Sequence, residues 1–229
     1  MTPFKLSEEL LDQINNDIVA QNNNALQTLV KEYHYADLAE IFEALQIDQA
    51  VYLFKLIDSE KSADMLPELD EDVRESILDA LSSEEIATEI EELDTDDAVD
   101  IIAELSDEVR TEVINQISDT EHADDIRELL TYDENSAGGL MAKELVCVNQ
   151  NWTVTRCVRE MRIQAQEVTR VHSIYVVDNE NILLGRLSLK DLLTANEKSK
   201  IKSVYIPKVD YVTIDVDGEE VAKIMSKYD

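Results

Sequence analysis

The side chains of this sequence that could do chemistry are carboxylates. Asp94, Asp96, Asp97 and Asp100 crowd the start of one predicted helix, and Asp96 and Asp100, four residues apart, can point the same way. Two carboxylates placed in this way could share a hard divalent cation. The same acids would be favourable at a helix N-terminus without any ligand, because the helix dipole stabilises negative charge there. The local pattern by itself favours this second interpretation.

The other reactive side chains form no pattern that predicts catalysis. The sequence shows no nucleophile–base pair, no zinc-ligand spacing among its 3 histidines and no phosphate-binding loop. Cys147 and Cys157 lie among aliphatic residues, so we expect buried, reduced thiols rather than a disulfide or a metal site. We therefore predict that the chain is not an enzyme.

The acids are concentrated in one half of the chain. Residues 1–135 hold 38 Asp and Glu against 7 Lys and Arg, whereas residues 136–229 hold 13 of each, so the net charge of −31 falls entirely in the first part. This step in charge predicts two domains. An acidic domain repels nucleic acid and attracts cations or basic partners. No stretch of 18 apolar residues is present, so we expect no membrane crossing within this chain, and cytoplasmic residence fits.

Apolar residues in the acidic half recur at a constant interval of twelve. The recurring positions are Leu45, Ile57, Leu69, Leu81, Leu93, Leu105, Ile117 and Leu129. The residue three places before each is also apolar, and the residue four places before is apolar in all cases except Glu89 and Asp125, so each unit carries a helical stripe. Helix-start residues such as Ser82 stand between the stripes. Short helices at a fixed interval predict an α-solenoid with two helices in each 24-residue repeat, rather than one long helix or a coiled coil.

The neutral half predicts a compact α/β module followed by part of another. After Tyr132, short apolar runs alternate with segments of helical spacing, and a second such series begins after Pro207. The expected strands are 145–148, 173–177, 182–187 and 209–214, and the expected helices are 153–162, 188–193 and 219–227.

This half resembles the CBS domain, a module that commonly occurs in tandem pairs. The matching pattern is Tyr175–Asp178 followed by Gly185–Asp191. In that family the Ser/Thr and the Asp of the second segment, here Ser188 and Asp191, often hold the phosphate and ribose of a nucleotide. A carboxylate can accept hydrogen bonds from ribose hydroxyls, and N–H groups at a helix start suit phosphate. Ser188 and Asp191 equally fit a helix-capping pair, so the pattern identifies the fold better than a ligand.

The segment between the two halves resembles the junction motif of the MgtE family. Residues 132–141 read Tyr-Asp-Glu-Asn-Ser-Ala-Gly-Gly-Leu-Met, close to that family's tyrosine, acids and Ser-Ala-Gly-Gly-Leu-Met. The resemblance covers essentially the whole chain in the family's order. It predicts an α-solenoid of short helices over 1–131, the junction at 132–141, a CBS domain over 142–203 and the first half of a truncated second CBS domain over 204–229.

The resemblance implies a magnesium-sensing function. MgtE proteins are homodimeric magnesium channels in which an acidic helical domain and two CBS domains lie in the cytoplasm below a membrane domain. Mg²⁺ ions between these domains draw the acidic surfaces together and close the pore. The residues that match the family's metal-binding acids are Asp96, Asp100, Asp217, Glu219 and Asp229. Some members also bind ATP at the CBS pair, which would involve Ser188 and Asp191.

Two other functions remain open on the sequence alone. An adenine-nucleotide-sensing CBS module of some other protein would use Arg186 and Lys190 near phosphate, but it leaves the acidic solenoid unexplained. An acidic solenoid scaffold for a basic partner explains the charge but leaves the CBS half without a role. The transmembrane domain and the second half of the second CBS domain are outside this sequence, so we expect the chain's own interdomain sites to be incomplete.

Overall fold

The computed structural model describes residues 4–166, 168, 171 and 173–228 of the chain. It contains two compact units, which are considered one at a time. The solenoid unit comprises Met1–Leu93 and Asp97–Glu128, and the α/β unit comprises Asp94–Asp96 and Leu129–Asp229.

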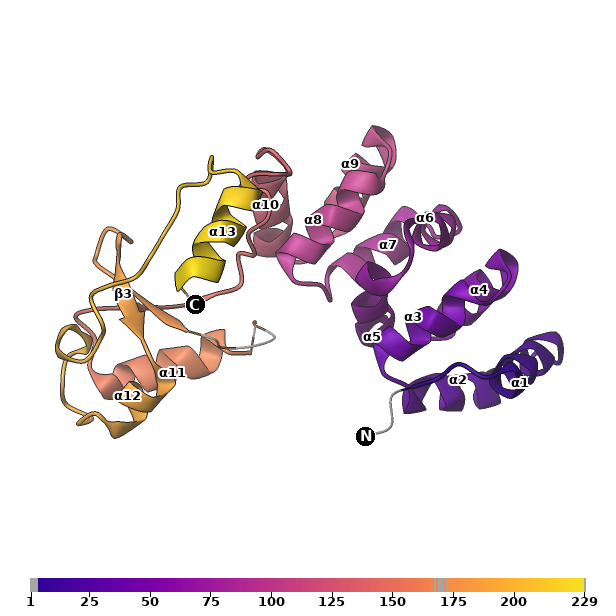
Figure 1. Ribbon diagram of the computed structural model, residues 1–229, viewed down its shortest axis with the longest axis horizontal. Coiled ribbons are helices and arrows are strands. Elements are labelled where there is room, and N and C mark those ends of the chain that lie inside the picture. Colours follow the sequence, from indigo (N-terminus) through magenta and orange to yellow (C-terminus); the bar gives the residue numbers. More distant parts are fainter. Residues whose placement is uncertain (1–3, 167, 169–170, 172, 229) are drawn as a thin grey trace. The chain divides into compact units, whose positions relative to one another are not determined.

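The solenoid unit consists of short helices that follow one another along the chain (Figure 1). Helix α3 packs on α5, α5 on α7 and α7 on α9, and α4 packs on α6, so these helices contact the one two places further on, as the 24-residue repeat predicts. The helices are α1 (Glu8–Val19), α2 (Asn23–Glu32), α3 (Tyr35–Glu43), α4 (Ile47–Phe54), α5 (Ser59–Met65), η1 (Leu66–Glu68), α6 (Glu71–Asp79), α7 (Ser83–Ile90), α8 (Thr95–Glu104), α9 (Asp107–Gln116) and α10 (Thr120–Leu129).

The predicted apolar stripes form the core of this unit. Every residue three places before the twelve-residue marker is buried, from Phe42 to Ile126. The marker positions alternate as far as Ile117: Leu45, Leu69, Leu93 and Ile117 are buried, whereas Ile57, Leu81 and Leu105 are only half-buried. The last marker, Leu129, is buried and departs from this alternation. The two helices of a repeat are therefore not equivalent, which confirms the 24-residue unit. Complete burial of one such Leu or Ile contributes about 1.5–3 kcal/mol.

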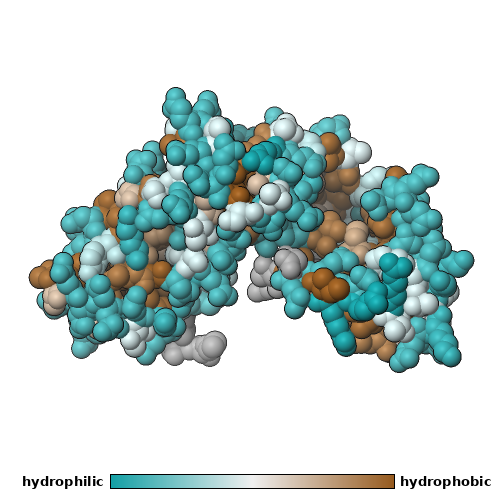
Figure 2. Space-filling model, turned by 180° about the vertical axis from the view of Figure 1, so that it is seen from behind, coloured by the Kyte–Doolittle hydropathy of each residue, from teal (hydrophilic) through white to brown (hydrophobic). Residues whose placement is uncertain are grey.

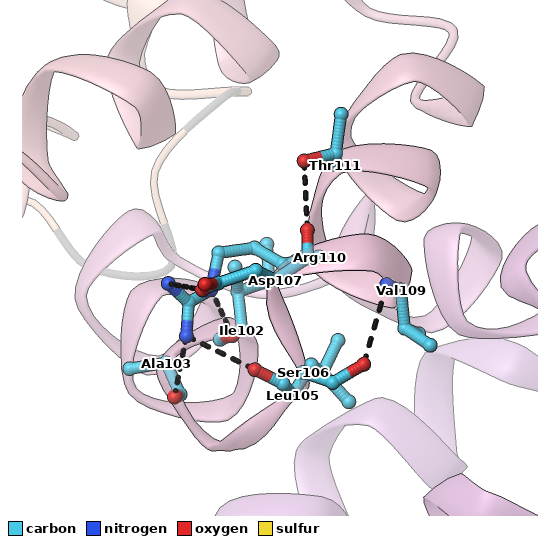
Figure 3. A network of polar contacts seen from close by, with 8 residues as sticks. All are labelled: Ile102, Ala103, Leu105, Ser106, Asp107, Val109, Arg110 and Thr111. Carbon is cyan, nitrogen blue, oxygen red and sulfur yellow. Dashed lines mark hydrogen bonds and ion pairs between the residues drawn. The ribbon is translucent and has the colours of Figure 1, made fainter.

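Side chains define where the helices begin and end. Ser82 and Glu85 form the predicted capping box at the start of α7. Pro67 stands in the first turn of η1, where no N–H is needed, so α5 ends at Met65. Arg110 donates to the main-chain oxygens of Ile102, Ala103 and Leu105 and so satisfies the carbonyl end of α8 (Figure 3).

The α/β unit contains a small mixed sheet of order β1-β2-β3. Strand β1 (Val146–Asn149) pairs in parallel with β2 (Ile174–Val177), and β2 pairs antiparallel with β3 (Leu183–Leu187). A parallel pair needs a crossover, which α11 (Val154–Gln164) provides. Alternate strand residues and the inner faces of the helices form the core, and the remaining elements are α12 (Leu189–Thr194), η2 (Ile201–Ser203) and α13 (Gly218–Tyr228).

One predicted strand of this unit is wrong. Residues 209–214 contain no strand, although the predicted helix that follows is present as α13. A strand requires a neighbouring ladder, and the bridges of Arg186 with Ile206 and of Ser136 with Asp217 are isolated and lie on either side of residues 209–214. Its side chains are correspondingly exposed, as Tyr211 shows. The β propensity of Val209–Ile214 was therefore not enough to form a strand without a partner.

Candidate metal and nucleotide sites

The predicted acid pair Asp96 and Asp100 lies on α8, one helical turn apart. Asp96 is half-buried and Asp100 is exposed. Asp100 also influences Arg74. The hydrogen bond that Arg74 donates to Glu104 is the main cause that raises the pKa of this guanidinium, and Asp100 is one of the nearby acids that raise it further. Both carboxylates supply the oxygen ligands that Mg²⁺ prefers. The donor chemistry of the pair therefore fits a hard divalent cation.

The N-terminus of α8 is capped by a residue that the sequence analysis did not single out. The Thr95 N–H donates to Glu144 Oε1 at 3.1 Å, and the Thr95 hydroxyl donates to Glu144 Oε2 at 2.8 Å. Thr95 is 1% exposed. Because Glu144 is 49 residues away in sequence, no local signal marks it as a cap. The sequence pattern placed only the aspartates of this segment at the helix start, whereas the structure adds a carboxylate from another segment.

Asp217 and Glu219 come together at the start of α13. Asp217 accepts the Glu219 N–H at 2.9 Å, so its carboxylate caps the helix, and Glu219 forms an ion pair with Lys223 at 3.7 Å. Both carboxylates are exposed. Asp229, the third acid predicted for this region, lies outside the described residues.

The junction segment positions the start of α13. Main-chain bonds run from Ala137 N to Val216 O at 2.7 Å, from Gly138 N to Ile214 O at 2.9 Å and from Gly218 N to the Asn135 oxygen at 2.7 Å. Next to these bonds lies a hollow of about 450 Å³, and both segments contribute acids to its lining. The lining residues are Thr131, Tyr132, Asp133, Asn135, Ser136, Ile214, Asp215 and Asp217. The junction therefore aligns the acids of its own segment with those of 215–217.

Within the described residues, no three or more His, Cys, Asp or Glu side chains are arranged to hold a metal ion. Each of the two acid pairs, on α8 and at the start of α13, thus offers two carboxylates at most. Mg²⁺ takes six oxygen ligands and usually keeps several waters, so a pair of carboxylates can hold it only together with water or with ligands from elsewhere.

Ser188 and Asp191 form a helix cap. Ser188 Oγ accepts the Asp191 N–H at 3.0 Å and donates to Asp191 Oδ2 at 2.7 Å, at the start of α12. This is the capping interpretation of the pair. Both residues are half-buried, and the same atoms would have to exchange these bonds for any nucleotide contact.

A second hollow of the α/β unit combines aromatic and cationic side chains. It has a volume of about 390 Å³ and is bordered by β2, β3, residues 208–212 and α13. Its lining includes Tyr175, Arg186, Lys208, Tyr211 and Tyr228. Aromatic faces suit a planar base and the two cations suit phosphate. The CBS pattern contained Tyr175 and Arg186, but it directed attention to Ser188 and Asp191, neither of which lines this hollow.

Helices α1–α13 and η1–η2, as far as the structure describes them, include none that is long and apolar enough to cross a membrane. Hydrophilic residues cover most of the face shown in Figure 2, and apolar residues appear there in separate patches.

The thiols of Cys147 and Cys157 are both free, and burial raises the pKa of Cys157 to about 11.

Comparison with family models and known sequences gives matches on both sides of the junction. Residues 33–135 match the MgtE intracellular N domain and residues 137–198 match the CBS domain. The chain is 43% identical over 98 residues to the magnesium transporter MgtE of Thermus thermophilus and 33% identical over 100 residues to that of Enterococcus faecalis. These matches cover 43% and 44% of this chain, and the chain spans 22% of each relative.

Two solved structures match nearly the whole chain. The crystal structure of the cytosolic domain of the Mg²⁺ channel MgtE in complex with ATP superposes with a TM-score of 0.87 at 28% identity, over 95% of this chain and 89% of that one. The crystal structure of the soluble part of a magnesium transporter gives a TM-score of 0.81 at 27% identity, over 96% of this chain and 87% of that one.

Proposed function

We propose that this chain, which belongs to the MgtE family, is the region of an MgtE-type magnesium channel that senses magnesium and sets the state of the pore. The observation that carries the proposal is the likeness of the two units, in order and over 95% of the chain, to the cytosolic domain of the Mg²⁺ channel MgtE. The acidic solenoid unit supports the same function. A nucleotide sensor would leave this unit unexplained, and a scaffold would explain it but leave the CBS half without a role.

Electrostatic repulsion between acidic surfaces provides the sensing mechanism. Carboxylates on separate surfaces repel one another until cations neutralise them. Asp96 and Asp100 on α8, and Asp217, Glu219 and Asp229 around α13, are the acids that would share Mg²⁺, directly or through its retained waters. If these acids bind the ion more tightly when the acidic surfaces are close together, Mg²⁺ shifts the equilibrium toward that closed arrangement. Low magnesium then favours the separated arrangement and an open pore.

The setting of this region follows from the same proposal. The channel would be a homodimer, and this chain would lie at the cytoplasmic face of the membrane, attached to its own transmembrane domain. The residues of the chain have no catalytic role in this function.

A nucleotide is a second proposed ligand. The matching cytosolic domain was solved in complex with ATP. In this chain, the hollow with Tyr175, Arg186, Lys208 and Tyr211 has the aromatic and cationic side chains that a nucleotide requires. Ser188 and Asp191 are the alternative ligands, and they would have to release their capping bonds. Isothermal titration of ATP against Arg186→Ala and Ser188→Ala distinguishes the two sets of residues.

The test of magnesium sensing compares Mg²⁺ with Na⁺ at matched ionic strength. We expect Mg²⁺ to raise the melting temperature and to reduce the radius of gyration, because a ligand that binds only the native state stabilises it. Equal effects of the two salts would mean general screening and would contradict specific sensing.

The residues are tested with a matched pair of double variants. Asp96→Asn with Asp100→Asn should weaken the Mg²⁺ response and leave the fold intact. Glu8→Gln with Asp12→Asn removes the same charge from two exposed acids with the same spacing on α1, and it should leave the response unchanged. If both pairs weaken the response equally, total charge rather than the α8 site is responsible.

A further inference from the structure

The start of α8 is held by both oxygens of one carboxylate. Glu144 accepts from the Thr95 N–H and from the Thr95 hydroxyl, at 3.1 and 2.8 Å. The hydroxyl in turn accepts the Lys143 N–H at 2.9 Å. Thr95 is 1% exposed, so neither of its groups can exchange these partners for water. Thr95, Lys143 and Glu144 all belong to the α/β unit.

Other helix starts in the solenoid receive such a carboxylate from the repeat itself. Glu43 Oε1 accepts the Asp70 N–H at 3.3 Å, directly before α6, across 27 residues. Glu91 Oε1 accepts the N–H of Ser118, again across 27 residues, and that of Asp119, directly before α10. The two acids lie two 24-residue repeats apart, so this interaction is a periodic feature of the solenoid.

The repeat does not supply this carboxylate at α8. The residue 27 places before Asp94 is Pro67, whose ring has no hydrogen-bond acceptor. Glu144 provides the carboxylate at this point, from a segment beyond the solenoid repeats. The one helix that carries the proposed sensing pair therefore has its start fixed from outside the repeat.

The position of Glu144 connects this helix start with the sheet. Thr95 directly precedes Asp96, and Glu144 stands two residues before β1. Hydrogen bonds to a carboxylate are short and directional, and two of them on one carboxylate fix its orientation. A change in the position of the first turn of α8 must therefore move Glu144 or break both bonds.

We propose that Glu144 is a positioning residue that couples cation binding at the start of α8, where Asp96 follows Thr95 directly, to the β1 strand of the same α/β unit. This proposal rests on the proposed function, because it requires that the acid pair binds Mg²⁺. Without the two bonds from Thr95, the ion can still bind to α8, but the sheet no longer responds.

Trp152 provides the readout on the sheet side. It is the only Trp of the chain, it follows β1 and it packs against the core of the α/β unit, with Arg156 over its ring at 4.3 Å. The experiment measures Mg²⁺ binding to the full 229-residue chain by calorimetry and, separately, the Mg²⁺-dependent change in Trp152 fluorescence.

Three variants decide the question. In Glu144→Gln, one oxygen acceptor is replaced by an amide donor, and we expect the Mg²⁺-dependent fluorescence change to be lost while Mg²⁺ binding is nearly unchanged. Thr95→Val keeps the N–H but loses the hydroxyl, and it should have the same effect. Glu91→Gln removes the matching carboxylate at α10 and should leave the fluorescence change intact.

The outcomes separate this inference from the proposed function. If the unmodified chain binds no Mg²⁺, the proposed function and this inference both fail. If it binds Mg²⁺ but Glu144→Gln and Thr95→Val keep the full fluorescence change, only the inference is overturned. A Mg²⁺-dependent fluorescence change that persists in the double variant Asp96→Asn with Asp100→Asn also overturns the inference, because the ion that causes it then binds elsewhere. Should Glu144→Gln not fold, Thr95→Val decides, with Thr95→Ser as the variant that must retain the response.

Discussion

Glu89 is a carboxylate at a position of the solenoid repeat that is otherwise nearly always apolar. Six of the other seven equivalent residues are Ile, Leu, Met or Val, and they include Met65 and Ile101. Ser62, which is fully buried, donates its hydroxyl to Glu89 Oε2 at 2.6 Å between α5 and α7. Burial raises the pKa of Glu89 from 4.5 to about 7; the Ser62 hydrogen bond lowers it, and the nearby acids Glu92, Asp58 and Glu85 raise it further.

The sign of the effect on stability follows from this shift. Because the folded state binds the proton more tightly than the unfolded state, the stability that Glu89 contributes is complete below pH 4.5 and is lost as the pH rises through 7. The full shift would correspond to about 3 kcal/mol. Because Glu89 is only half-buried, screening by solvent reduces this to about 1–2 kcal/mol.

Glu89→Gln removes the charge and keeps an acceptor for Ser62. We expect the free energy of unfolding to rise by about 1–2 kcal/mol at pH 8, and the gain to shrink toward zero as the pH falls to 4.5. Urea denaturation followed by circular dichroism at several pH values measures this gain. Glu85→Gln is the control of opposite sign, because the Ser82 N–H lowers the pKa of Glu85, so its substitution should not stabilise the fold at pH 8. A gain from Glu89→Gln that does not change with pH, or a loss at pH 8, would refute this reasoning.

Four further substitutions, one of them a control, test the fold through the same denaturation measurement. Ile102→Ala empties a fully buried position and should cost about 2–5 kcal/mol, whereas Ile182→Ala, at 58% exposure, should cost less than about 0.5 kcal/mol. Arg110→Met leaves the last carbonyls of α8 without their donor and should cost about 1–3 kcal/mol, with no dependence on Mg²⁺. Gly139→Ala would place a methyl group against the main-chain oxygen of Asp133 and should cost about 1–3 kcal/mol; an unchanged midpoint would show that the junction can relax.

The solenoid could be predicted because its periodicity is strong. The interval of twelve and the stripe that precedes each marker depend only on helix geometry and on the need to bury apolar side chains, and both are confirmed. The resemblance of the chain to the MgtE family and of its second half to the CBS domain is also confirmed, by the matches at 33–135 and 137–198. What periodicity could not predict is the Ser62–Glu89 pair, because two helices that are distant in sequence must meet before either residue has its partner.

The sites were less predictable than the fold for the same reason. Pairs within one turn, such as Asp96 with Asp100 or Ser188 with Asp191, follow from local spacing, and their places on α8 and α12 are as expected. Their role as ligands stays a prediction. Glu144 accepts hydrogen bonds from Thr95, which is 49 residues away, and the hollow beside Tyr175 is bordered by strands together with α13. No short segment of the sequence could therefore predict either feature.

The few basic residues of the acidic half explain why its charge remains available for cations. Lys61 donates to the main-chain oxygen of Val30 at 2.8 Å, and Lys55 to that of Ala80 at 3.0 Å. Arg110 likewise donates to three carbonyls around the end of α8. These cations therefore satisfy carbonyls at the ends of the solenoid helices. With only 7 Lys and Arg against 38 acids in residues 1–135, basic side chains can balance only a small part of the negative charge. Mobile cations must balance the rest, and a surface that depends on mobile cations responds to their concentration, as a magnesium sensor requires.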